Sequence, residues 1–255
     1  MRSVLLFGFL FLVTSSCRDN SERPKVDYSD ENVQTLTMDD VVSDTTKAIV
    51  ATLPLAFDST NVLIQPSGLV NIKDIKDFAI SERLSYSIET KVRGKTTEPN
   101  FYMNNMNRIY GDELSGQISN VYFDDLSTNT QRLLTNEYVF ISHIIYLREI
   151  AKKTDRHYLL YFVYDRDTNR DGKLNAEDIL SLYISNLDGT GFSKVTKDNH
   201  ELLNYRLIPL ANRYYYTTIE DVNKDGYFNK GDKYNYHYID FSVEPYRVIE
   251  YKPTL

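Results

Sequence analysis

Two twelve-residue segments, 167–178 and 221–232, carry oxygen-bearing side chains in the same order and at the same spacing. The predicted ligands of the first are Asp167, Asn169, Asp171, the backbone carbonyl of Lys173, Asn175 and Asp178. Those of the second are Asp221, Asn223, Asp225, the backbone carbonyl of Tyr227, Asn229 and Asp232. Alternate side chains of a tight loop converge on one point, and Ca²⁺ takes about six to eight oxygen ligands. The spacing therefore predicts two calcium sites, with Ca²⁺ as the cofactor.

The residues between the predicted ligands fit the same chemistry. Gly172 and Gly226 stand at the sixth position, where the chain must turn sharply. Leu174 and Phe228, two positions later, are apolar and are expected to point into the domain. Neither ligand set contains His or Cys, which argues against zinc or copper, and Mg²⁺ prefers water and phosphate ligands. The alternative is a pair of metal-free hairpin turns, although three carboxylates crowded into one turn would repel each other without a cation.

These segments resemble the calcium loops of EF-hand and dockerin-type proteins, and the resemblance covers all twelve positions of each. It implies calcium coordination by the residues named above. The sequence departs from the EF-hand pattern in two respects. Asp178 and Asp232 close the loops where Glu is usual, and the flanking residues have the pattern of strands rather than helices. We therefore expect a static clamp between neighbouring strands and no helix–loop–helix switch.

The amino-terminal residues have the layout of a secretory signal peptide. Arg2 supplies a positive charge, and Val4–Val13 is an uncharged, mostly apolar run that is shorter than the roughly 20 residues needed to span a bilayer. Small residues precede Cys17, the sole cysteine, as in the lipobox of bacterial lipoproteins, although Thr14 stands where Leu is usual. This resemblance implies a signal peptide over 1–16 and acylation of Cys17. The alternative is an ordinary secreted protein.

Composition divides the mature chain into a tether and a domain. Residues 17–47 are rich in Asp, Glu, Ser, Asn and Thr, and are expected to form a flexible tether that follows the lipidated cysteine. Residues 48–255 are expected to form a β-rich calcium-binding domain, because short apolar or alternating runs are separated by turn residues. The predicted strands are Ala48–Phe57, Asn61–Ile64, Arg83–Val92, Val121–Leu126, Val139–Leu147, Tyr158–Tyr164, Leu180–Leu187, Tyr205–Leu210, Tyr214–Glu220, Tyr234–Phe241 and Tyr246–Tyr251. Short helical turns are expected at Glu149–Lys153 and Ala176–Ile179.

A weak internal repeat runs through the domain. Residues 183–187 match 122–126 at an offset of 61, and the two Asp-rich segments align at an offset of 54. The run Leu182–Gly191 also resembles the blade ending of TolB-type β-propellers, in which a strand ends in an Asp-Gly turn. The fold class predicted is all-β, with propeller-like repeated β-blades. A β-sandwich is the alternative fold.

No catalytic motif stands out elsewhere in the sequence. The four histidines have no ligand spacing and are interpreted as surface or strand residues; they are His143, His157, His200 and His237. Asp124 and Asp125 are a carboxylate pair, but adjacent strand residues point to opposite faces. The tyrosines of the run 214–216 are interpreted as packing residues rather than a platform for sugars.

The net charge of −7 argues against a nucleic-acid partner. We expect a non-enzymatic binding or scaffold lipoprotein of the cell envelope, anchored in the outer membrane or at the cell surface rather than in the inner membrane. Its partner would be a protein or a glycan. One alternative is a calcium-dependent envelope enzyme acting on glycans, which would need two carboxylates about 5–10 Å apart in a pocket outside the loops. Another is a purely structural envelope protein.

Overall fold

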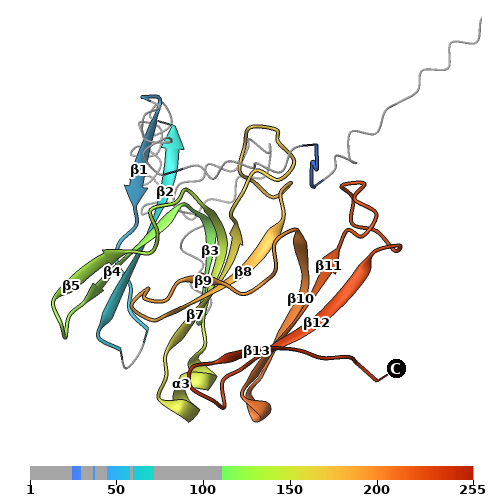
Figure 1. The fold of residues 1–255 in the computed structure, drawn as a ribbon. Coiled ribbons are helices and arrows are strands. Elements are labelled where there is room, and N and C mark those ends of the chain that lie inside the picture. Colours follow the sequence, from blue (N-terminus) through green and yellow to red (C-terminus); the bar gives the residue numbers. More distant parts are fainter. Residues whose placement is uncertain (1–24, 30–36, 38–44, 58–59, 72–110, 255) are drawn as a thin grey trace, which may run out of the picture.

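The computed structural model describes residues 25–29, 37, 45–57, 60–71 and 111–254 (Figure 1). The predicted signal peptide, Cys17 and the predicted strand Arg83–Val92 lie outside these residues. The described part is all-β, as predicted, apart from the short helix α3 (Arg148–Thr154) and the 3₁₀ turn η1 (Pro209–Ala211). None of the helices in the described residues is long and apolar enough to cross a membrane.

The strands form three antiparallel sheets. The first has the order β1-β2-β4-β5, with β1 (Lys47–Ala51), β2 (Val62–Asn71), β4 (Asn120–Asp125) and β5 (Thr130–Leu133). The middle sheet has the order β3-β6-β7-β8-β9, with β3 (Glu113–Ile118), β6 (Phe140–Tyr146), β7 (Tyr158–Tyr164), β8 (Leu180–Asn186) and β9 (Ser193–Lys194). The third is a meander of β10 (His200–Ile208), β11 (Arg213–Glu220), β12 (Lys233–Asp240) and β13 (Arg247–Glu250).

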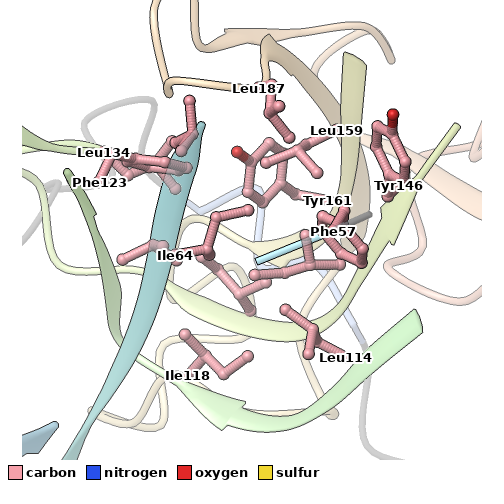
Figure 2. Packing of buried hydrophobic residues seen from close by; sticks show 14 of the residues in the cluster. Phe57, Ile64, Leu114, Ile118, Phe123, Leu134, Tyr146, Leu159, Tyr161 and Leu187 are labelled. Atoms are coloured by element: carbon pink, nitrogen blue, oxygen red, sulfur yellow. The ribbon is translucent and has the colours of Figure 1, made fainter. Parts of the chain in front are cut away.

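Strand β7 contributes side chains to two hydrophobic cores and thereby joins the three sheets. Its sequence YLLYFVY is apolar on both faces, and its first six residues are buried. Leu159, Tyr161 and Val163 pack into one core with residues of the first sheet such as Ile64 and Phe123 (Figure 2). The alternate residues of β7 pack into a second core with the third sheet; they are Tyr158, Leu160 and Phe162. Because side chains of a strand alternate between faces, a continuous apolar run marks a strand covered on both sides.

The internal repeat is visible in the strand pairing. At the offset of 54 residues, β8 falls on β12 and β9 falls on β13; at the offset of 61, β8 falls on β4 and β9 falls on β5. Each of these pairs is an antiparallel hairpin at the edge of its sheet. No propeller is detected, because the described residues form three sheets and a closed propeller needs at least about four blades.

Several predicted boundaries shift in the structure. Strand β10 begins at His200, five residues before its prediction, because its first half, HELL, lacks a clear alternation yet pairs with β11 around a bulge between Leu202 and Asn204. The expected helix at Glu149–Lys153 is confirmed as α3. The helix expected at Ala176–Ile179 is wrong: these residues form a single turn, which the Asp178 N–H closes on Asn175 O at 3.2 Å. It does not continue as a helix because the Ile179 N–H donates to the Thr168 hydroxyl and β8 begins at Leu180.

Candidate metal-binding loops

The two Asp-rich segments occupy equivalent places in two sheets. Segment 167–178 (loop 1) joins β7 to β8, and segment 221–232 (loop 2) joins β11 to β12. The last strand pair below loop 1 is Tyr164 with Leu180, and below loop 2 it is Glu220 with Lys233. The predicted strand flanks are therefore confirmed, and each loop closes an antiparallel hairpin at the same end of its sheet.

The first carboxylate of each loop holds the sharp turn that the glycine makes. The N–H of Gly172 donates to Asp167 Oδ2 at 2.8 Å, and the N–H of Gly226 donates to Asp221 Oδ2 at 2.7 Å. Both glycines have positive φ values, +79° and +85°, which a residue without a β-carbon adopts at little cost. The residues two positions earlier, Arg170 and Lys224, also have positive φ values of 57° and 59°. The same backbone path is therefore built twice.

The later positions repeat the same hydrogen bonds. At position 3, Asn169 Oδ1 and Asn223 Oδ1 each accept an N–H from position 5 at 3.0 Å. At position 5, the carboxylate oxygen Oδ1 of Asp171 or Asp225 accepts the backbone N–H of position 7 at 2.9 Å in both loops. At position 12, Asp178 Oδ2 accepts the N–H of Asn175 at 2.9 Å, and Asp232 Oδ2 accepts that of Asn229 at 2.8 Å. The side-chain oxygens of both loops thus turn inward toward the loop backbone.

The closing carboxylates are buried. Asp178 has no exposed surface, and Asp232 is 7% exposed. Asp221, the first carboxylate of loop 2, is also buried. Burial raises the pKa of Asp178, the N–H groups of Asn175 and Thr168 lower it, and the nearby Asp167 carboxylate raises it again. Buried carboxylates are costly unless they are paired or hydrogen-bonded, and here backbone N–H groups supply the hydrogen bonds.

The donor set is what a hard cation requires. Each predicted set offers three carboxylates, two side-chain amides and one backbone carbonyl, and oxygens of these kinds suit Ca²⁺. Within the described ranges, no three His, Cys, Asp or Glu side chains converge into a cluster that could hold a metal ion. The carboxylates of each loop instead accept hydrogen bonds from the backbone of their own loop. The structure therefore brings the predicted ligands of each loop onto one hydrogen-bonded turn.

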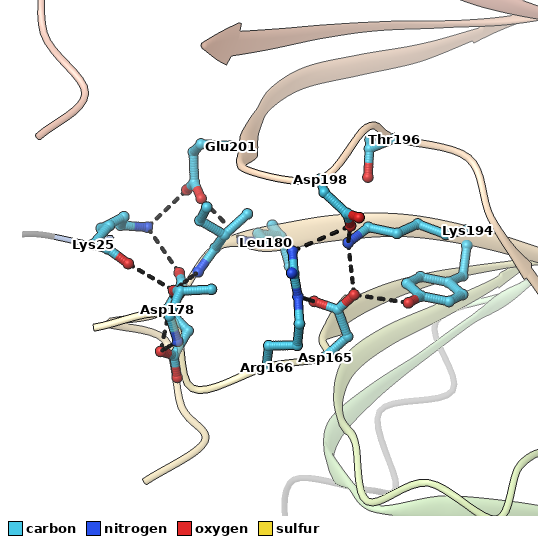
Figure 3. Close-up of polar contacts among 12 residues, drawn as sticks. Lys25, Asp165, Arg166, Asp178, Leu180, Lys194, Thr196, Asp198 and Glu201 are labelled. Atoms are coloured by element: carbon cyan, nitrogen blue, oxygen red, sulfur yellow. Dashed lines mark hydrogen bonds and ion pairs between the residues drawn. The ribbon is translucent and has the colours of Figure 1, made fainter. Parts of the chain in front are cut away.

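A second polar cluster pins the entrance of loop 1 to the turn after β9. Figure 3 shows the Lys194 ammonium between two carboxylates, 2.6 Å from Asp165 Oδ2 and 2.7 Å from Asp198 Oδ1. The Tyr183 hydroxyl donates to Asp165 Oδ2 at 2.8 Å. Asp165 is 7% exposed, so these contacts at Oδ2 pair a buried charge two residues before the first predicted ligand, while Oδ1 accepts no hydrogen bond from any described residue. It is a structural ion-pair network that the sequence pattern did not reveal.

Sequence reasoning also missed two parts of the loop surroundings. Residues 25–29, within the predicted tether, lie against both loops. Thr168, at the second position of loop 1, is 2% exposed, and its hydroxyl contacts Lys25 O, Ile179 N and Asp178 Oδ1. The available signal was the alternation of Val26 and Tyr28 with polar residues, which is too short to identify a strand.

The histidines are strand or loop residues, but two of them lie together. His200 on β10 and His237 on β12 are both buried, and burial lowers the pKa of each. His237 stacks on Tyr216 with ring centroids 5.2 Å apart. His237 and Tyr216 line a cavity of about 210 Å³ together with Lys197 and Glu250.

A larger cavity of about 480 Å³ lies beside loop 1. Its wall contains Asn175 and Glu177 from the loop, Tyr138 from the segment before β6, Phe140 from the start of β6, and Gln117 from β3. Glu177 is its one carboxylate among the lining residues. A third cavity, of about 150 Å³, is lined by Asp124. Asp125, its neighbour in the sequence, instead accepts the Ser127 N–H at 2.8 Å and so stabilises the turn after β4.

Comparisons with known proteins give no assignment. No protein-family model, no curated protein and no solved structure matches this chain.

Proposed function

We propose that this chain is a calcium-binding module of the cell envelope, in which loops 1 and 2 each hold one Ca²⁺. The observation that carries the proposal is the equivalence of the two loops: they share ligand types, hydrogen bonds and two positive-φ positions, and they close equivalent hairpins. Two metal-free turns would not have to carry the same carboxylates at the same positions. The predicted ligands are those given above, from Asp167 to Asp178 and from Asp221 to Asp232.

Bound calcium would supply the charge that each loop lacks. In loop 1 the Asp167 carboxylate raises the pKa of the buried Asp178, and a divalent cation held by both carboxylates would offset such repulsion. Because the flanking elements are antiparallel strands, the cation would fix a hairpin end and not drive a helix movement. The module is therefore proposed as a static, calcium-stabilised scaffold rather than a sensor.

The test is thermal unfolding of the chain in EDTA, in excess Ca²⁺ and in excess Mg²⁺. We expect Ca²⁺ to stabilise the fold by about 2.7 kcal/mol per site at a hundredfold excess over Kd, and Mg²⁺ to give a smaller effect. Titration calorimetry should report two calcium ions per chain. Asp155→Asn, which removes a carboxylate at the end of α3, is the matched control and should leave the calcium effect unchanged. Identical curves in all three media would reject the proposal.

The membrane attachment is a proposal of its own. The support is the small-residue run before Cys17, and the expected modification is acylation of that thiol. In a bacterial host, labelling with a fatty-acid analogue should mark the chain, and Cys17→Ser should abolish the label and release the protein from the membrane fraction. We place the module at the outer membrane or cell surface, without enzymatic activity.

The cavity beside loop 1 favours a glycan as the partner. Aromatic rings and amide groups line it together, and Asn175 belongs both to the cavity wall and to the predicted ligand set. Neutral oligosaccharides titrated into the calcium-loaded chain should bind, and Tyr138→Ala should weaken that binding more than Tyr234→Ala, which alters an exposed tyrosine elsewhere.

The matching strands β4, β8 and β12 also support blade-like repeats as the origin of the three sheets.

A further inference from the structure

The segment Lys25–Ser29 (the strap) lies across both loops, although it precedes them by more than a hundred residues. The backbone N–H groups of Lys25 and Val26 donate to Gly226 O of loop 2 at 2.8 and 3.3 Å. The next N–H, of Asp27, donates to Thr168 O of loop 1 at 2.8 Å. In Figure 1 this blue segment lies between the loop that joins β7 to β8 and the loop that joins β11 to β12.

Side chains reinforce these backbone contacts. The Thr168 hydroxyl donates to Lys25 O at 2.6 Å. The Lys25 ammonium lies 2.7 Å from Glu201 Oε1 and 3.4 Å from the Asp178 carbonyl oxygen (Figure 3). Glu201 Oε2 in turn accepts the Leu180 N–H at 2.9 Å. The strap is thereby joined to the end of loop 1 and to the start of β8.

The apolar residues of the strap also have defined places. Val26 is 6% exposed. The Tyr28 side chain lies near the Asp221 carboxylate, the first predicted ligand of loop 2, and burial together with the charge of that carboxylate raises the pKa of Tyr28 to about 12. The Lys224 ammonium lies 6.0 Å from the centre of the Tyr28 ring. A single short segment therefore contacts a ligand residue of one loop and the backbone of both.

The backbone contacts of the strap use atoms that calcium would not need. Its backbone acceptors are the carbonyls of Thr168 and Gly226, at loop positions 2 and 6, whereas the predicted carbonyl ligands are those of Lys173 and Tyr227 at position 7. Docking of the strap and binding of a cation are therefore compatible. Thr168 and Gly226 stand next to predicted ligands in the chain, so the docked strap restrains the backbone from which those ligands project, and each event should strengthen the other.

We infer that the strap is a positioning element of the two-loop site, and that its docking is coupled to calcium binding with a positive sign. This inference rests on the proposed function for its calcium half. By thermodynamic reciprocity, the factor by which the docked strap raises calcium affinity equals the factor by which calcium raises the population of the docked strap. Tyr28 would act by holding the Asp221 carboxylate in place.

The experiment uses the full chain and two readouts. The first is hydrogen–deuterium exchange of the Lys25, Val26 and Asp27 amides, with calcium and with EDTA. The second is calcium affinity by titration calorimetry for Val26→Asp, for Tyr28→Phe and for the matched control Leu53→Asp, whose side chain is 87% exposed. We expect the three amides to be protected and calcium to increase their protection. Val26→Asp should weaken calcium binding by roughly fivefold or more, Tyr28→Phe should weaken it less, and the control should not change it.

The two proposals fail in different ways. If the wild-type chain binds no calcium, the proposed function is wrong, while protected strap amides in EDTA would still establish docking. If calcium binds but the strap amides exchange at the rate of a free peptide in both conditions, the inference is overturned and the proposed function stands. Equal calcium affinities of wild type and Val26→Asp would overturn it as well.

Discussion

The ring of Phe123 fills the space that a β-carbon on Gly189 would occupy, 2.5 Å from the nearest ring atom. Gly189 belongs to the Asp-Gly turn after β8 of the middle sheet, and Phe123 lies on β4 of the first sheet. The contact therefore joins two sheets through a glycine. It also explains the Asp-Gly turn in physical terms, because the glycine adopts a φ of +79° and admits an aromatic ring at the same time.

Replacing Gly189 should destabilise the fold by more than the cost of its left-handed backbone conformation alone. We expect Gly189→Ala to cost about 2–4 kcal/mol, since overpacking against a buried ring adds to the cost of the left-handed backbone. Gly111→Ala is the matched control, because Gly111 has a similar φ of +64° but no atom within 4 Å of the added methyl group. Chemical denaturation of both variants measures the difference. Equal losses would show that Phe123 moves aside freely.

The two metal loops should be separable by single substitutions. Asp178→Asn in loop 1 or Asp232→Asn in loop 2 should each lower the calcium stoichiometry from two to one, because a closing carboxylate is lost while the amide keeps the size of the side chain. The titration should show the remaining site in each variant. Loss of both sites from either single change would instead indicate that the loops bind as one unit.

The buried Asp165 should depend on its lysine partner. Lys194→Met should destabilise the fold by about 2–4 kcal/mol, because it leaves a buried carboxylate without its closest cation. Lys152→Met is the control: its ion pair with Glu149 is largely exposed, and such pairs contribute about 0–1 kcal/mol. Urea denaturation at neutral pH gives both values. A small loss for Lys194→Met would mean that Arg166 and Tyr183 suffice to hold the charge.

Mild acid should weaken the third sheet. Burial depresses the pKa of His200 and His237 below the ordinary value of 6.5, so the folded state favours their neutral forms. As the pH falls through 6.5 the unfolded chain takes up protons first, and the free energy of unfolding falls until the folded-state pKa values are passed. For His237, Glu250 opposes this shift and Lys197 reinforces it. Stability attributable to these histidines is therefore complete above 6.5 and is lost below it.

Melting temperatures between pH 7.5 and 5 test this dependence. His237→Gln should flatten the profile, whereas His143→Gln, which alters a half-exposed histidine on β6, should leave it as in the wild type. A wild-type profile that is flat over this range would contradict the prediction.

Much of the fold could be predicted from the sequence because the periodicity of apolar residues indicates which side chains of a strand are buried. Strand β7 is apolar at every position, and β11 and β12 alternate clearly, so these strands were located to within a residue or two. Strand β5, with the sequence TQRL, is exposed at every position and has no such pattern. It forms because β4 offers a pairing edge, which is information that local sequence does not hold.

The loops and the strap show the same limit. Ligand spacing within twelve residues is local, so both loops could be predicted with their strand flanks. The contact between Thr168 and Lys25 joins residues 143 positions apart and could not. Neither could the approach of His200 to His237, which depends on the register that β11 imposes between β10 and β12.

If Cys17 carries the proposed acyl anchor, the docked strap limits how far the domain can stand from the membrane. Lys25 lies only eight residues after Cys17, whereas β1 begins thirty residues after it. An extended residue spans at most about 3.6 Å, so a lipid-anchored chain with its strap docked keeps the loops within about 29 Å of the bilayer surface. With the strap released, the start of β1 could stand up to about 110 Å from the bilayer surface. Local calcium concentration would then set the height at which the domain meets its partners.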